Sequence, residues 1–194
     1  MTRARTIATI TFVVLSFGLS WLVALPLWLG EGLASPLAGT LIPLMMFTPA
    51  LAVLITMLAL RFPARGERLR FLGMWPLRPA KRVIGLSVLA LFGPTVLVAL
   101  TLAVAALFGW VTLDLVGLSG FSQNLAAAVP EGTPAPPAWT VLIVQLITIP
   151  IAGATINALL AFGEEIGWRG FLVPALRPLG TWPTLLLSGV AVVL

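Results

Sequence analysis

The fold is decided by residues 138–172, which carry the sequence AWTVLIVQLITIPIAGATINALLAF (138–162) followed by GEEIGWRGFL (163–172). The first part has no charged side chain and exceeds the length of about 20 mostly apolar residues that a membrane-spanning helix needs. The second part places Glu164, Glu165 and Arg169 directly at its end. An ionised side chain near the bilayer centre costs roughly 2.5–3.5 kcal/mol, so these three residues need partners or water. We therefore expect the polar end of this helix to carry the function.

Three further uncharged stretches are long enough to span a membrane, at residues 6–29, 37–60 and 83–108. Hydrophobic residues make up 60% of the chain and charged residues 9%, which is far from the composition of soluble domains. The sequence therefore predicts an all-α, multi-helix integral membrane bundle with four complete spanning helices.

A shorter apolar run, residues 182–194, predicts a partial fifth span. As a helix it extends about 20 Å, whereas the hydrocarbon core is roughly 30 Å thick. Nothing polar or basic marks its end. We therefore expect a truncated helix that continues beyond residue 194, with a short re-entrant segment as the alternative.

Positive charge is concentrated in one loop. Residues 61–82 contain seven arginines and lysines and one glutamate, a charge of +6, whereas the whole chain carries +5. The rest of the chain is thus slightly acidic, and the basic balance does not indicate nucleic-acid binding. Short basic loops stay in the cytoplasm, so this loop and the N-terminus are expected inside, and residues 30–36 and 109–137 outside. We expect an integral protein of the bacterial plasma membrane in contact with membrane lipid; binding of anionic headgroups is a secondary role for the loop.

The chain has no cysteine and no histidine. Within these residues, that composition excludes disulfides, thiolate catalysis, serine–histidine catalysis and the HExxH zinc motif. One short motif, Gly117-Leu118-Ser119-Gly120, has the GxSG form associated with rhomboid serine proteases. We do not assign Ser119 as a nucleophile, because it lies outside the predicted spans and no histidine can activate it.

The spacing of the three charged residues gives their two carboxylates different surroundings. Glu165 and Arg169 are one helical turn apart, in the favourable order of acid before base. Glu164 projects roughly 100° away from Glu165 around the same helix. We therefore expect one carboxylate to pair with the arginine and the other to face a cavity.

The stretch from Asn157 to Leu172, NALLAFGEEIGWRGFL, resembles the first motif, EExxxR, of the CAAX prenyl protease and bacteriocin-processing (CPBP, or Abi-type) family of intramembrane endopeptidases. The flanking Gly163 and Trp168 and the Gly170-Phe171-Leu172 continuation are also similar to the family. The resemblance covers about residues 140–189. The expected domains are residues 1–137, with three membrane helices, the basic loop 61–82 and the outer loop 109–137, and residues 138–194, a partial CPBP domain.

The resemblance implies hydrolysis of a peptide bond near the cytoplasmic membrane face, in a prenylated or otherwise membrane-associated peptide. Glu164 would be the general base that activates water. Glu165 would support it by hydrogen bonding or coordination, and Arg169 would hold the carboxylates or the substrate. These roles agree with the residue types, because amide hydrolysis requires a deprotonated base within reach of a water molecule.

The family also has an FxxxH motif on the next helix and a later histidine, groups that stabilise the oxyanion or bind a divalent metal. This sequence has neither, so the metal requirement stays undetermined. Loss of an oxyanion donor costs on the order of 10²–10³ in rate. We therefore expect the 194-residue chain to be inactive, or nearly so, on its own.

Two other classes of function remain open at this point. The chain could be a non-catalytic immunity or scaffold protein of the same family, acting through helix packing. It could also be a transporter fragment with Glu164 and Glu165 in an ion path, a common role of carboxylates within membranes. For Glu164, Glu165 and Arg169 themselves, the simplest alternative is an ion pair at the end of a helix.

Overall fold

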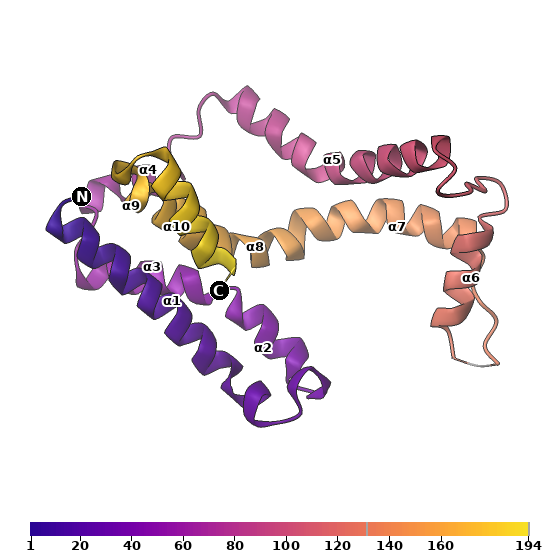
Figure 1. The fold of residues 1–194 in the computed structure, drawn as a ribbon, viewed down its shortest axis with the longest axis horizontal. Helices are drawn as coiled ribbons and strands as arrows, with labels where there is room; N and C mark the ends of the chain where they lie inside the picture. Colours follow the sequence, from indigo (N-terminus) through magenta and orange to yellow (C-terminus); the bar gives the residue numbers. More distant parts are fainter. Residues whose placement is uncertain (131, 194) are drawn as a thin grey trace. The chain divides into compact units, whose positions relative to one another are not determined.

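The computed structural model describes residues 1–130 and 132–193, with side chains described as far as residue 191. All regular structure in this part of the chain is helical, as the sequence predicts, and Figure 1 gives the order of the helices. The helices form two compact units, Met1–Pro79 with Asn157–Leu194, and Ala80–Ile156. The EExxxR segment therefore packs with the first 79 residues. The domain division expected at residues 137 and 138 follows the family resemblance and stays a prediction.

The first unit is built on α1 (Arg3–Leu29), which lies beside α3 (Thr48–Ala59; Figure 1). The hydroxyl of Thr2 accepts a hydrogen bond from the Arg5 amide at 3.4 Å and caps the start of α1. Ala8 of α1 and Ala52 of α3 are both fully buried in the core that these helices share. The buried core consists of Ala8, Phe12, Ala52, Val53, Met57, Phe171, Leu172, Ala175 and Leu176.

The predicted span at residues 37–60 is not one continuous helix. After a 3₁₀ turn at Gly32–Ala34, the chain forms α2 (Ala38–Met45) and then α3, and these two helices are bent by about 40°. Pro49 has no N–H to donate to the carbonyl of Met45, one turn earlier. The hydroxyl of Thr48 donates to that carbonyl instead, at 2.8 Å. The Met45 carbonyl, which the bend would otherwise leave without a donor, therefore keeps a hydrogen bond.

The basic loop contains a 3₁₀ turn, Arg65–Glu67, and the short helix α4 (Arg68–Phe71). The guanidinium of Arg68 donates through Nη2 to the main-chain carbonyl of Met57 at 2.6 Å. Met57 lies in the last turn of α3, where carbonyls lack partners within the helix. One of the seven basic residues of the loop thus fastens a helix end.

The second unit contains α5 (Ala80–Leu107), α6 (Ser119–Ala128) and α7 (Ala138–Ala152). The loop between α5 and α6 is tied to the start of α7, because the indole N–H of Trp139 donates to the carbonyl of Val116 at 3.0 Å. The predicted span at residues 83–108 is present as α5 and begins three residues earlier, at Ala80.

The helical path from α7 continues well past residue 162, where the predicted fourth span ends. It passes through a π-helical stretch η3 (Gly153–Asn157), α8 (Ala158–Glu165), a second π-helical stretch η4 (Ile166–Leu172), α9 (Val173–Leu176) and a 3₁₀ turn (Arg177–Leu179). Pro174 and Pro178 are the second residues of α9 and of the 3₁₀ turn, so their missing N–H groups fall where the path changes from one helical type to the next. Gly180, with φ +97°, ends the path before α10 (Thr181–Val193).

Three helical stretches are long and apolar enough to cross a membrane: Arg3–Leu29, Ala80–Leu107 and Ala138–Leu179. The bent pair of α2 and α3 makes a fourth if its halves act as one span. Most large apolar side chains on these helices are exposed in the described part of the chain, as expected for surfaces in contact with lipid. The structure thus supports a membrane protein.

Candidate active site

Glu164 and Glu165 are the last two residues of α8, and Arg169 follows in η4. The guanidinium of Arg169 donates to the carboxylate of Glu165, which confirms the predicted ion pair. The side chain of Glu165 is 43% exposed and that of Arg169 is 74% exposed. An exposed pair at this spacing stabilises a helix by only about 0.3–0.5 kcal/mol. Its main effect is therefore to orient the two side chains.

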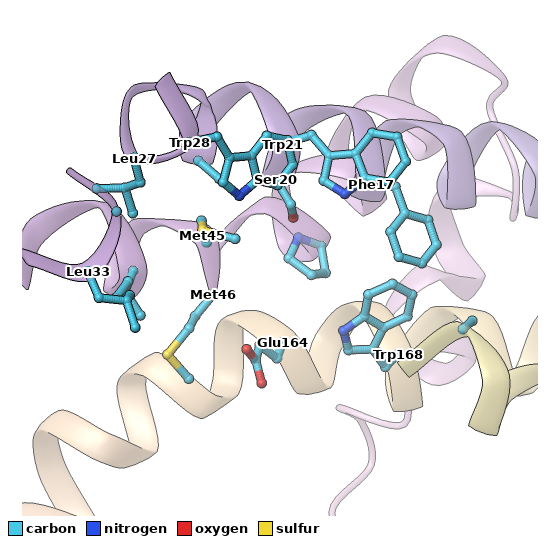
Figure 2. A pocket seen from close by; sticks show the side chains of 15 residues that line it. Phe17, Ser20, Trp21, Leu27, Trp28, Leu33, Met45, Met46, Glu164 and Trp168 are labelled. Carbon is cyan, nitrogen blue, oxygen red and sulfur yellow. The ribbon is translucent and has the colours of Figure 1, made fainter. Parts of the chain in front are cut away.

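Glu164 lines a cavity of about 680 Å³ within the first unit. Figure 2 shows Glu164 and Trp168 on one wall and Phe17, Trp21 and Trp28 of α1 on the facing wall. Among the described residues, neither an ion pair nor a hydrogen bond engages the Glu164 carboxylate. The expectation that one carboxylate pairs while the other faces a cavity is confirmed.

The remaining wall of this cavity is formed by the bend between α2 and α3. Met45 and Met46 line it there, together with Pro49 (Figure 2 labels the two methionines). The hydroxyls of Ser20 and Thr48 share a hydrogen bond, which ties α1 to the bend. The cavity is thus mostly apolar, and among the described residues that line it Glu164 alone is ionisable.

A second cavity, of about 600 Å³, adjoins the same helix on the side of α10. Glu164, Glu165 and Arg169 line it together with Ser188 and Gly189 of α10. Glu164 therefore contributes to the walls of both cavities, and the Glu165–Arg169 pair to only the second. The three predicted residues are brought together, and they share this space.

Two glycines fix the position of the glutamates against the bend. A Cβ atom on Gly163 would lie 2.7 Å from the main-chain oxygen of Met46, and one on Gly167 would lie 2.4 Å from Cβ of Pro49. Only hydrogen atoms fit at these positions. The GxxxG spacing of Gly163 and Gly167 is typical of close helix contacts in membranes. The backbone of α8 and η4 therefore touches the bend directly.

Aromatic side chains hold Trp168, the neighbour of Arg169. Its ring centre lies 5.6 Å from that of Phe12 and 5.9 Å from that of Phe17. Phe12 in turn packs on Phe171 at 5.0 Å, and both phenylalanines are fully buried. Aromatic pairs at these separations contribute about 0.5–1.5 kcal/mol beyond the area they bury. The site is thus anchored to α1 through rings rather than through charges.

The described residues do not fit a catalytic zinc centre. A catalytic zinc ion takes three protein ligands, and the described part of the chain has no group of three histidine, cysteine, aspartate or glutamate side chains able to hold a metal ion. Of the two available carboxylates, that of Glu165 already accepts from Arg169. The described donor set is thus one carboxylate without a partner, Glu164, beside the Glu165–Arg169 ion pair.

The GxSG motif lies in the second unit, where it closes a loop. The carboxylate of Asp114 accepts hydrogen bonds from the backbone amides of Gly117 at 2.7 Å, Val116 at 3.1 Å and Ser119 at 3.3 Å. The amide of Gly117 is the main cause that holds the pKa of Asp114 below its ordinary value of 3.8, followed by the amide and hydroxyl of Ser119. Ser119 thus has a structural partner at the start of α6.

The lowered pKa of Asp114 predicts that its loop loosens only in acid. A depressed folded-state pKa stabilises the loop at pH values above 3.8, and this contribution is lost as the pH falls through the lowered value. The indole N–H signal of Trp139, which is bonded to Val116, reports the change in an NMR titration from neutral pH to about pH 3.

Asp114→Asn provides the control for this titration. We expect its Trp139 signal to show a loosened loop already at neutral pH and to change little on acidification. A wild-type transition well above pH 3.8, or one that persists in the Asn variant, would contradict the assignment to Asp114.

Sequence reasoning missed the residues that form the facing walls. Ser20, Trp21 and Trp28 lie on one span and the two methionines on another, and no motif marks them. The aromatic residues of α1 recur at Phe17, Trp21 and Trp28, separated by four and seven residues, which places them on one helix face. That spacing was the available signal.

Comparison with known proteins gives no relative on which a family assignment could rest. No protein-family model, no curated protein and no solved structure matches this chain.

Proposed function

We propose that this protein is an intramembrane endopeptidase of the CAAX type, set in a bundle of four spans, that hydrolyses a peptide bond near the cytoplasmic membrane face. The proposal rests on one observation. Glu165 is paired with Arg169, whereas Glu164 borders two cavities and has no partner in the described part of the protein. An unpaired carboxylate beside a space large enough for water and substrate suits a general base.

In this mechanism, Glu164 accepts a proton from a water molecule while the oxygen of that water attacks the carbonyl carbon of the peptide. The proton then passes to the leaving nitrogen, and the carbon–nitrogen bond breaks. Arg169 holds Glu165 in place and presents positive charge to the substrate in the second cavity. The first cavity, with its aromatic and methionine walls, accepts an apolar side chain or prenyl group of the peptide.

The site lacks the hydrogen-bond donors of the resembled family that would stabilise the oxyanion formed during peptide hydrolysis. The resembled family has histidines that stabilise the oxyanion or bind a metal, and this sequence has none. Each missing donor lowers the rate on the order of 10²–10³-fold. The second cavity lies beside Glu164 and is large enough for a small donor molecule such as imidazole. Slow cleavage that added imidazole accelerates is therefore the expected behaviour.

The test uses the purified protein in phospholipid vesicles with a set of membrane-anchored peptides, some of them prenylated. Mass spectrometry identifies new C-termini, and rates are compared with and without imidazole in the buffer. Glu164→Gln is expected to lower both rates about 10²-fold or more, because the amide cannot accept the proton. The control is Glu67→Gln, which removes a glutamate of the basic loop that borders neither cavity.

The control variant is expected to cleave like the wild type. Equal cleavage rates for Glu164→Gln and the wild type would show that Glu164 is not the general base. Cleavage that is insensitive to imidazole would show that the second cavity does not serve the oxyanion.

A further inference from the structure

Four arginines converge on one groove of about 550 Å³ in the first unit. Arg5 comes from the first turn of α1, Arg70 from α4, Arg169 from η4 and Arg177 from the 3₁₀ turn after α9. The groove residues include no aspartate or glutamate. Segments that are far apart in the sequence thus bring like charges to one place.

The four guanidinium groups differ in how they are held. Arg5 lies over the rings of Phe62 and Phe71, 5.8 Å and 6.0 Å from their centres, and Arg169 is paired with Glu165. Arg70 and Arg177 are exposed, and within the described residues neither has an acidic partner within 4.0 Å. Like charges gathered in this way repel one another unless an anion lies between them. Arg70 and Arg177 therefore bring positive charge to the groove with no acidic partner in the described part of the chain.

We propose that this groove binds a phosphate group, as a monoester or a diester. Guanidinium groups match phosphate oxygens through paired N–H donors, and a phosphate can satisfy two or three of them at once. The groove lies beside the first turn of α1 and the basic loop, which the charge pattern places on the cytoplasmic side. Phospholipid headgroups present phosphate at that level, and soluble phosphate presents the same oxygens. This site does not depend on the proposed peptidase activity.

The experiment measures binding to the detergent-solubilised protein by isothermal titration calorimetry. Three probes are used: dihexanoyl phosphatidic acid, dihexanoyl phosphatidylcholine and inorganic phosphate. The test variant is Arg70→Gln with Arg177→Gln, because both side chains are exposed and neither packs on an aromatic ring or pairs with Glu165. The matched control is Arg65→Gln with Arg78→Gln, which removes the same charge from exposed loop positions outside the groove.

We expect the groove variant to weaken binding of phosphatidic acid about tenfold or more, since two guanidinium groups that donate to the phosphate are removed at once. The control is expected to weaken it by no more than about twofold, because screening reduces the effect of distant charges. Arg70→Lys with Arg177→Lys, which keeps the charge but loses the paired donors, is expected to fall between the two.

The outcomes separate the sources of the phosphate. Binding of phosphatidic acid without inorganic phosphate assigns the groove to a lipid headgroup, and comparable binding of both assigns it to a free phosphate group. Equal loss in the groove and control variants would overturn the proposal, because the attraction would then be diffuse. Absence of binding by all three probes would overturn it as well.

Discussion

Gly167→Ala is expected to lower the free energy of unfolding by about 1–3 kcal/mol and to displace the glutamates from their cavities. The new Cβ would lie 2.4 Å from Cβ of Pro49 and 3.1 Å from its carbonyl carbon. A proline ring cannot rotate out of the way, so η4 must move off the bend between α2 and α3. Thermal unfolding in detergent, followed by circular dichroism, measures the loss.

Gly18→Ala is the matched control for this substitution. Gly18 lies inside α1, and a Cβ there meets nothing within 4 Å. Alanine in a helix interior is favoured over glycine by up to about 1 kcal/mol, so this variant is expected to be slightly more stable than the wild type. If Gly167→Ala behaves like Gly18→Ala, the close contact with Pro49 does not exist.

Exchange of the paired charges, Glu165→Arg with Arg169→Glu, is expected to preserve the fold and abolish peptide cleavage. The pair re-forms at the same spacing in the less favourable order, which changes stability by no more than about 0.5 kcal/mol. Position 165 then carries a guanidinium in place of the carboxylate that the mechanism needs beside Glu164. We expect cleavage to fall about 10²-fold or more, with the melting temperature nearly unchanged.

Arg169→Lys, measured in the same assay, keeps the positive charge at residue 169 but loses the planar guanidinium group. It keeps a cation near Glu165 and leaves Glu164 unpaired, so we expect most of the cleavage to remain. If the exchanged protein cleaves as fast as the wild type, Glu165 and Arg169 form only an ion pair on a helix surface, and the roles proposed for them in cleavage are wrong.

The all-helical fold class and the Glu165–Arg169 ion pair could both be predicted from short stretches of sequence. The absence of charge over long stretches predicts α1 and α5, which begin at Arg3 and Ala80 rather than at residues 6 and 83, since charged residues are tolerated in a first turn. The spacing of Glu165 and Arg169 alone predicts their contact, because it depends only on the geometry of one helix.

The walls of the site could not be predicted in the same way. At the break after α2, Pro49 lacks an N–H and the Thr48 hydroxyl donates to the carbonyl of Met45 instead. A prediction based only on the length of the apolar stretch does not detect this break. The spacing of Gly163 and Gly167 indicates a close contact without naming the partner, which lies more than a hundred residues earlier in the chain. Contacts between such distant segments depend on the packing of the whole unit.

The carboxylate of Glu164 belongs to the lining of two cavities, one beside α1 and one beside α10, and its single charge acts in both. A cation that binds this carboxylate from the cavity beside α1 offsets its negative charge in the cavity beside α10 as well. The occupants of the two spaces therefore compete for one group even when they never touch. Whichever molecule arrives first sets the electrostatic potential that the second one meets.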